Sequence, residues 1–413
     1  MVLLFLISGL FLGWSLGANN ASNVFGSAVA SRLVKFRTAA IIASVFVIIG
    51  AVVQGAGASH TLGKLGAVNA VGGSFTVALA AAITVYVLTK FALPASATQA
   101  IVGAIIGWNF FTGNSTDSTA LEQIVTTWII GPVLGAVFAV LLYILLKRIK
   151  ISSHIHLVRF ESYIKSALII VGAFGAYSLG ANNIANVMGV FVPAFSLNDL
   201  HIWGLTFSSG QQLFMLGGLA IAAGIITYSR KVMETVGGNI VELSSEAALV
   251  VVLAQALVLF IFSSSGLSRF FVSIGLPAIP MVPVSSSQVI VGCILGIGLY
   301  NGAGNINFRI LGEIGIGWVA TPVSSGLLSF LSLFFMKNIF GVDVGAKIVP
   351  GMDDSLIKIQ NITNGAQVSG IVKYLLTGLI ISGTIIFVIY ILLDRRKKLI
   401  LQRSEEKFWK NLK

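Results

Sequence analysis

Long apolar runs recur from one end of the chain to the other, and short polar motifs interrupt several of them. Runs of roughly 17 or more apolar residues are long enough to cross a bilayer whose hydrocarbon core is about 30 Å thick. Helices are the structure that such runs favour, because each helix satisfies its own backbone hydrogen bonds. The pattern therefore predicts an all-α polytopic membrane protein built as one membrane domain.

The polar motifs occur twice and in the same order, which indicates an internal duplication. A Gly-Ala-Asn-Asn motif at residues 17–20 recurs at 180–183, an offset of 163 positions. Residues 94–103 match residues 283–292 at an offset of 189, and a Pro-Val pair at 132–133 recurs at 322–323. The second half thus carries about 26 additional residues between its first two motifs, and we expect much of this length near residues 263–280.

Charged residues make up only 10% of the chain, and the net charge of +12 is concentrated beside apolar segments. One basic cluster lies at residues 147–165 and a second follows the last apolar segment, at residues 395–413. Because positive charge marks the cytoplasmic side of a membrane protein, both clusters are predicted to lie inside the cell. This explanation disfavours nucleic-acid binding. It predicts a multi-pass plasma-membrane protein with its N-terminus outside and its C-terminus in the cytoplasm.

The two clusters also set the direction of the spans. The segment 128–146 then runs from outside to inside, whereas its repeat partner 318–336 runs the other way. We therefore predict two inverted-topology repeats of about five membrane segments each, with broken helices or re-entrant hairpins, and a C-terminal helix. The expected organisation is a first inverted repeat at 1–150, a second at 151–337, an external loop at 338–370, a last transmembrane helix at 371–394 and a cytoplasmic basic tail at 395–413.

The first repeated motif places amide side chains in apolar runs, where a buried polar group is costly unless it is paired. Asn20 and Asn23 are three positions apart, on one helical face, and Asn183 and Asn186 repeat that spacing. Glycines on both sides suggest a helix that unwinds locally and frees backbone carbonyls. Amide and carbonyl oxygens suit Na⁺, although amides also join membrane helices by ordinary hydrogen bonds. The candidate Na⁺ ligands are Asn19, Asn20, Asn23, Asn182, Asn183 and Asn186.

The second repeated motif combines proline with hydroxyl and amide side chains. Pro94 and Pro283 interrupt apolar stretches, and proline is favoured in the first turn of a helix. A half-helix starting there would direct its backbone N–H groups and about half a positive charge at the protein centre. Two such ends facing each other would hold a compact oxyanion, although a simple kink is the alternative. The candidate anion-binding side chains are Ser96, Thr98, Gln99, Ser285, Ser286, Ser287, Gln288, Ser324 and Ser325.

The apolar segments offer little for catalysis. They hold no His-Glu or Asp pair at metal-binding spacing and no Ser-His partnership, so neither an enzyme nor a resident cofactor is expected. Cys293 is the only cysteine, which rules out an intrachain disulfide and a cysteine metal cluster. Transport is the role that the two motifs favour.

With these motifs the chain resembles the inorganic phosphate transporter (PiT) family. The signature of that family is a Gly-Ala-Asn-Asp-type motif in each half, followed by a Pro-x-Ser-x-Thr-type hairpin. The resemblance covers roughly residues 1–393. It implies Na⁺- or H⁺-coupled uptake of inorganic phosphate, inverted repeats, and a homodimer that works by an elevator-like or rocking movement.

One departure from the family pattern bears on the coupling ion. The family's Asp is replaced by Asn20 in the first copy and by Asn183 in the second. Because an amide does not titrate, this departure favours Na⁺ over H⁺. We predict a secondary active transporter that imports inorganic phosphate with Na⁺, with both ions bound at the repeated motifs. Coupling to H⁺, transport of sulfate or another oxyanion, and an anion channel stay open as alternatives.

Overall fold

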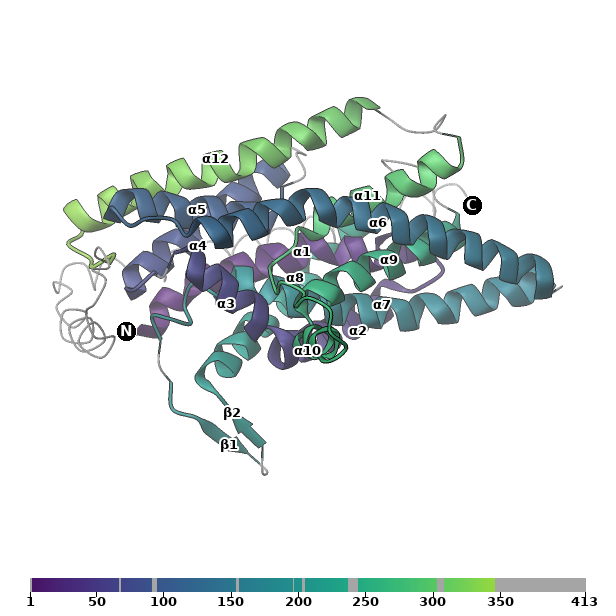
Figure 1. Ribbon diagram of the computed structural model, residues 1–413, viewed down its shortest axis with the longest axis horizontal. Coiled ribbons are helices and arrows are strands. Elements are labelled where there is room, and N and C mark those ends of the chain that lie inside the picture. The colour runs from purple at the N-terminus through teal and green to yellow at the C-terminus, as the bar shows by residue number, and fades with distance from the viewer. Residues whose placement is uncertain are drawn as a thin grey trace, which may run out of the picture.

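A computed structural model of the chain describes residues 2–66, 68–90, 95–153, 156–195, 197–202, 205–236, 244–302 and 308–345. Almost all of these residues are helical, which confirms the predicted all-α class. Seven of the described helices are long and apolar enough to cross a membrane. The longer helices lie roughly along one common axis (Figure 1).

The described helices divide between the two halves of the sequence. In the first half, after a 3-10 turn at Val2–Phe5, they are α1 (Leu6–Ala30), α2 (Phe36–Gln54), α3 (Ala56–Leu65), α4 (Val71–Lys90), α5 (Ala97–Thr112) and α6 (Ser118–Ser153). In the second half they are α7 (Leu157–Met188), α8 (Ser209–Val236), α9 (Ser245–Ser263), α10 (Ser265–Ser273), α11 (Ser286–Tyr300) and α12 (Phe308–Asn338). Two short antiparallel strands, β1 (Leu200–Ile202) and β2 (Leu205–Phe207), precede α8.

Helices of one half pack on helices of the other half, and the same pairing occurs in both directions. Helix α1 packs on α8 and α2 packs on α7, while α5 packs on α12 and α6 on α11. Glycines permit the close approach: a Cβ on Gly50 would clash with the Tyr177 carbonyl, and one on Gly224 would clash with the Trp14 carbonyl. Tyr177 is the equivalent of Trp14 at the motif offset of 163, and Gly224 is the equivalent of Gly50. The two close contacts are therefore the same contact, made once in each direction between the halves.

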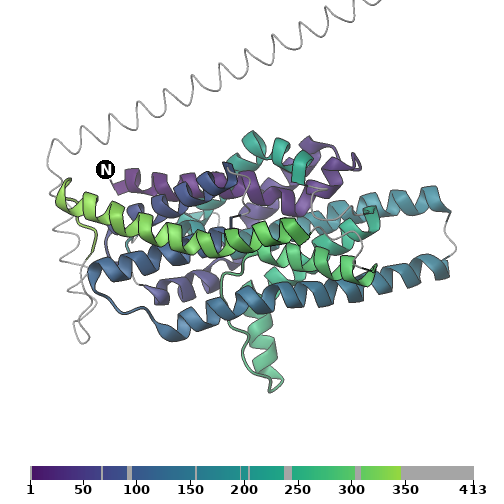
Figure 2. The same ribbon diagram turned by 90° about the horizontal axis from the view of Figure 1, so that it is seen from above.

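The equivalent helices α6 and α12 run in opposite directions. Figure 2 shows α12 ending close to the N-terminus, whereas α6 starts at that side and meets α7 at the far end of the molecule. This arrangement fits the relation between halves that the basic clusters predicted. The orientation of the molecule in a membrane stays a prediction.

The additional length of the second half occupies two places. Helix α10 lies between α9 and α11, inside the predicted range 263–280, and projects from the bundle in Figure 2. The β1–β2 hairpin projects separately between α7 and α8, and the sequence pattern did not reveal it. The offset between equivalent residues accordingly rises from 163 at the Asn motifs to 174 at Gly50 and Gly224, and then to 189 at α5 and α11.

The start of the predicted external loop 338–370 folds back onto the helices. Val342 and Val344 are buried, and the indole Nε1 of Trp108 on α5 donates a hydrogen bond of 2.7 Å to the carbonyl of Val344. Residues 339–345 therefore cover α4 and α5 rather than extending away from them. The rest of that loop, the last transmembrane helix 371–394 and the tail 395–413 lie outside the described residues.

Candidate functional site

Two helical hairpins meet tip to tip at the centre of the molecule. One consists of α4 and α5 and the other of α9 and α11, and Figure 2 places α5 and α11 toward opposite ends of the long axis. The Oγ atoms of Ser96 and Ser285 lie 2.8 Å apart in a hydrogen bond across the tips. Both side chains are 1% exposed. The structure thus joins two residues that are 189 positions apart in the sequence.

The two serines also begin the helices behind them. Ser96 Oγ accepts a hydrogen bond of 3.3 Å from the backbone N–H of Gln99, and Ser285 Oγ accepts the same bond from Gln288. Each serine is therefore an N-cap that satisfies one of the free N–H groups of the first turn. The expectation that proline opens these helices was wrong for Pro283, which lies before the N-cap and outside the helix; Pro94 is outside the described residues.

Asn182 holds the tip of the second hairpin through its backbone. Its Nδ2 donates a hydrogen bond of 2.7 Å to the carbonyl of Val284, and its Oδ1 accepts one of 2.8 Å from the N–H of the same residue. Val284 immediately precedes Ser285, and it lies outside any helix or strand. The Asn182 amide on α7 therefore satisfies both backbone groups of Val284, as a neighbouring β-strand would do in a sheet.

The Asn motif of each half also contacts the hairpin of the other half. Asn20 Nδ2 on α1 donates a 3.3 Å bond to Ser286 Oγ, and Asn186 Nδ2 on α7 donates a 2.9 Å bond to Thr98 Oγ1. Thr98 Oγ1 in turn donates a hydrogen bond of 3.4 Å to the carbonyl of Val284. Both repeated motifs therefore converge on one buried polar centre, although they were separate signals in the sequence.

The motif helices are continuous, which corrects the expectation of local unwinding. Helix α1 runs through residues 17–26 without interruption, and α7 runs through residues 180–188 in the same way. A Cβ on Gly17 would clash with the Ile221 carbonyl, and one on Gly180 would clash with the Val47 carbonyl. These glycines are needed for close helix packing. Ligand atoms at the motifs must therefore come from side chains.

Several buried side-chain atoms at this centre lack a hydrogen-bond partner among the described residues. An unsatisfied buried donor or acceptor costs about 1–3 kcal/mol, so such a group points to a ligand that supplies the missing bond. The donors are the Nδ2 atoms of Asn23 and Asn183, and the acceptors are Asn186 Oδ1, Gln99 Oε1 and Gln288 Oε1. Gln99 and Gln288 are equivalent in the two halves, so the same acceptor is open on both hairpins.

The structure does not bring every predicted site residue to the centre. Ser324 is exposed on α12, so its hydroxyl points away from the bundle interior and does not contribute to an anion cradle. The neighbouring Ser325 is fully buried on α12, with its Oγ unsatisfied within the described chain. Asn19 and Ser287 are partly buried beside their motif partners. Of the two α12 serines that were predicted as phosphate ligands, only Ser325 is therefore buried.

Gln255 on α9 is a buried polar residue that the repeats did not reveal. It is 2% exposed, and neither of its amide atoms has a hydrogen-bond partner in the described residues. The equivalent position in the first half is Ala81, at the offset of 174, so no duplication marked it. The only indication of this buried polar residue in the sequence was a single glutamine within an apolar run. The described residues contain no group of three His, Cys, Asp or Glu side chains that could hold a metal ion.

Comparison with known proteins places this geometry in a family. Residues 16–329 match the model of the phosphate transporter family, which spans both Asn motifs and both hairpins. The chain belongs to the phosphate transporter family. It is a membrane transporter of phosphate rather than an enzyme.

Similar proteins of this family span the chain. A "Putative phosphate permease" of Thermococcus kodakarensis is 26% identical, with 81% of this chain and 98% of that protein covered. One of Methanocaldococcus jannaschii is 29% identical, with 79% and 95% covered. The solved structure of a protein described as "The sodium-dependent phosphate transporter" has a TM-score of 0.65 at 22% identity, and covers 82% of this chain and 99% of that one. This likeness shows that the fold is shared.

Proposed function

We propose that this member of the phosphate transporter family is a secondary active transporter that imports inorganic phosphate together with Na⁺. The observation that carries the proposal is the meeting of two capped half-helices, α5 and α11, at Ser96 and Ser285. Each helix N-terminus carries about half a positive charge. Two positive ends enclosed in a bundle repel each other, and a bound anion between them converts that repulsion into attraction.

Phosphate would enter between the hairpin tips. The Ser96–Ser285 hydrogen bond occupies that place in the present conformation, so binding exchanges it for bonds from both hydroxyls to the anion. The N–H groups of the first turns of α5 and α11 would add further donors. The remaining proposed phosphate ligands are Thr98, Gln99, Ser286, Ser287, Gln288 and Ser325.

The open acceptors favour phosphate over sulfate. Gln99 Oε1 and Gln288 Oε1 are buried and need a hydrogen-bond donor. Monobasic phosphate carries two O–H groups, whereas sulfate at neutral pH carries none. A site that offers buried acceptors rejects a ligand without donors, because those acceptors then stay unsatisfied.

Na⁺ would bind beside the anion through side-chain oxygens of the Asn motifs, that is of Asn19, Asn20, Asn23, Asn182, Asn183 and Asn186. Asn186 Oδ1 is buried and lacks a partner in the described chain, so it is the first ligand that we propose. Because Asn20 and Asn183 are amides, neither can carry a coupled proton. The description of the solved neighbour as sodium-dependent supports the same choice.

An inverted repeat and a plasma-membrane location are part of the proposal. The reciprocal helix contacts and the opposite run of α6 and α12 support the inverted relation. A homodimer and an elevator-like or rocking movement follow from the resemblance alone. Direct contact between the hairpin tips argues against an anion channel, because a channel requires a continuous pore.

Replacing Ser96 or Ser285 by alanine tests the site. A hydrogen bond to a charged ligand contributes about 1.5–3 kcal/mol, so each change should weaken phosphate binding by at least about tenfold. Binding is measured by calorimetry on purified protein with phosphate and with sulfate. The control is Ser166→Ala, an exposed serine on α7. Wild-type affinity in both hairpin variants, or equal affinity for sulfate, would contradict the proposal.

A further inference from the structure

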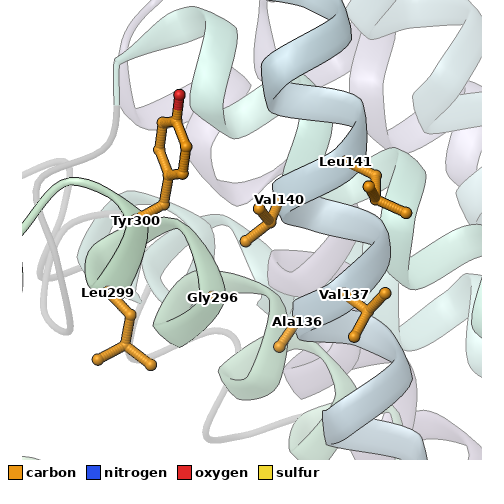
Figure 3. Close-up of a pocket in the computed structure, with 7 residues that line it drawn as sticks. All are labelled: Ala136, Val137, Val140, Leu141, Gly296, Leu299 and Tyr300. Atoms are coloured by element: carbon orange, nitrogen blue, oxygen red, sulfur yellow. The ribbon is translucent and has the colours of Figure 1, made fainter.

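An apolar groove opens on the outer surface between α6 and α11. It has a volume of about 390 Å³ and is lined by Ala136, Val137, Val140, Leu141, Gly296, Leu299 and Tyr300. Figure 3 shows Ala136 and Val140 on the side of α6 toward α11, whereas Val137 and Leu141 lie on the other side of that helix. Leu141 and Leu299 are 58% and 62% exposed, so the groove faces the surroundings of the helix bundle and not the polar centre.

A positive charge sits at one end of the groove. Lys147 follows Val140 by seven positions on α6, which places it on the same face two turns further along. Its Nζ lies 4.5 Å from the ring centroid of Tyr143 and 5.0 Å from that of Tyr300, which lines the groove. Lys147 is therefore held over the mouth of the groove by two aromatic rings.

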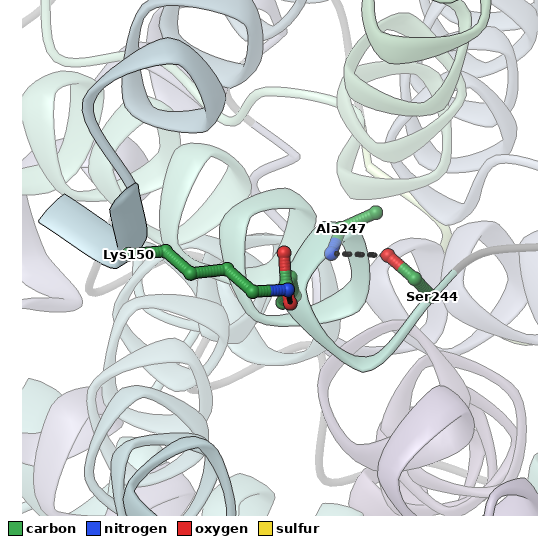
Figure 4. A network of polar contacts seen from close by, with 4 residues as sticks. Lys150, Ser244 and Ala247 are labelled. Atoms are coloured by element: carbon green, nitrogen blue, oxygen red, sulfur yellow. Dashed lines mark hydrogen bonds and ion pairs between the residues drawn. The ribbon is translucent and has the colours of Figure 1, made fainter. Parts of the chain in front are cut away.

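The charge of Lys147 is not neutralised by a carboxylate among the described residues. The neighbouring Lys150 differs, because its Nζ forms an ion pair with Glu246 in the first turn of α9. Figure 4 shows Lys150 extended toward that turn. Of these two lysines, Lys147 is the one whose charge is available to a ligand in the groove.

The equivalent place in the other half of the protein holds a larger side chain. Phe330 on α12 is equivalent to Val140, and its ring packs edge to face on Phe111 of α5 at 5.7 Å. On the α6 side, Tyr300 packs instead on Tyr143, one turn beyond Val140, at 5.8 Å. Lys337 is the equivalent of Lys147, and its Nζ lies 5.8 Å from the ring centroid of Phe111. Both halves therefore place a lysine over the aromatic ring at this position. Valine stands beside the groove where the other half has phenylalanine, so the smaller side chain leaves more space there.

We propose that this groove binds one anionic phospholipid, with an acyl chain along Val140 and Gly296 and its phosphate at Lys147. Exposed apolar residues around the groove match the hydrocarbon region of a bilayer. The basic cluster 147–165 is predicted to lie at the cytoplasmic surface, where anionic lipids attract basic side chains. The proposal is independent of phosphate transport, because none of the groove residues contacts the hairpin tips.

The test compares two lipids on delipidated full-length protein, with bound lipid counted by native mass spectrometry. Wild-type protein should retain one phosphatidylglycerol, bound about fivefold more tightly than phosphatidylcholine, since one basic residue near a membrane surface gives an advantage of this size. Lys147→Ala should abolish the preference. Val140→Phe, which copies the other half, should remove the bound lipid of either type. Leu331→Phe on the exposed face of α12 is the matched control, and it should change neither the amount of bound lipid nor the preference for phosphatidylglycerol.

Three results would overturn the proposal. The first is equal retention of the two lipids by wild-type protein, the second is unchanged lipid binding by Val140→Phe, and the third is an unchanged lipid preference in Lys147→Ala. If Val140→Phe keeps its lipid but shifts from dimer to monomer, the groove is instead an interface between two copies of the chain. The phosphate uptake of Val140→Phe in proteoliposomes shows whether that variant is folded.

Discussion

Asn182→Leu should reduce phosphate uptake by at least about 100-fold while the protein still inserts into membranes. Leucine has nearly the shape of asparagine but cannot bond the backbone of Val284 at 2.7 and 2.8 Å. Loss of the amide leaves the buried N–H of Val284 unsatisfied, at about 1–3 kcal/mol, and leaves its carbonyl with only the 3.4 Å hydrogen bond from the Thr98 hydroxyl. The extended segment before Ser285 then has no fixed position, and the N-cap of α11 no longer faces Ser96.

The measurement is uptake of radiolabelled phosphate into proteoliposomes at matched protein content. Asn338→Leu is the control, because the amide of Asn338 is exposed at the end of α12 and bonds only the last turn of its own helix. Uptake by Asn182→Leu within tenfold of wild type would show that the amide is not needed to hold the hairpin. Normal insertion is checked by size-exclusion chromatography of both variants.

Gly292→Ala and Gly103→Ala should both destabilise the protein strongly, by about 1–3 kcal/mol or more, and to a similar extent. A Cβ on Gly292 would clash with the backbone of Pro132 on α6, and one on Gly103 would clash with the backbone of Pro322 on α12. Backbone cannot move aside as a flexible side chain does, so each change must separate two packed helices. The two effects should match because the contacts are the same with the halves exchanged.

Gly63→Ala on α3 provides the control. No atom lies within 4 Å of the added Cβ there, and alanine favours a helix over glycine by up to about 1 kcal/mol. Its melting temperature should therefore equal or exceed that of wild type, whereas both packing variants should melt lower and lose uptake. Equal melting temperatures for all three variants would mean that the α5–α12 and α6–α11 contacts have room for an added methyl group, which would contradict the prediction.

The duplicated motifs predicted that the two hairpin tips face each other with the Asn motifs beside them, because a repeat of polar residues in an apolar chain has few structural explanations. The hydrogen bond between Ser96 and Ser285 fits that expectation, whereas the bonds of Asn186 to Thr98 and of Asn20 to Ser286 were not predicted residue by residue. The family, the helical class and the place of the added helix α10 also followed from the sequence.

The roles of glycine and proline could not be predicted from the sequence. Glycine serves both for unwinding a helix and for close packing, and only the carbonyls of Ile221 and Val47 beside Gly17 and Gly180 distinguish the two uses. Ser324 and Ser325 are adjacent, so one lies on the outer face of α12 and the other on its buried face. Which face is buried depends on the packing partner α5, which is more than 200 positions away in the sequence.

The coupling of phosphate uptake to Na⁺ is tested most directly by transport into sealed proteoliposomes with purified protein. Uptake of radiolabelled phosphate should rise when an inward Na⁺ gradient is imposed at constant pH, and an inward H⁺ gradient without Na⁺ should not replace it, because Asn20 and Asn183 cannot carry a proton. Phosphate uptake that is indifferent to the Na⁺ gradient but follows the H⁺ gradient would contradict the account.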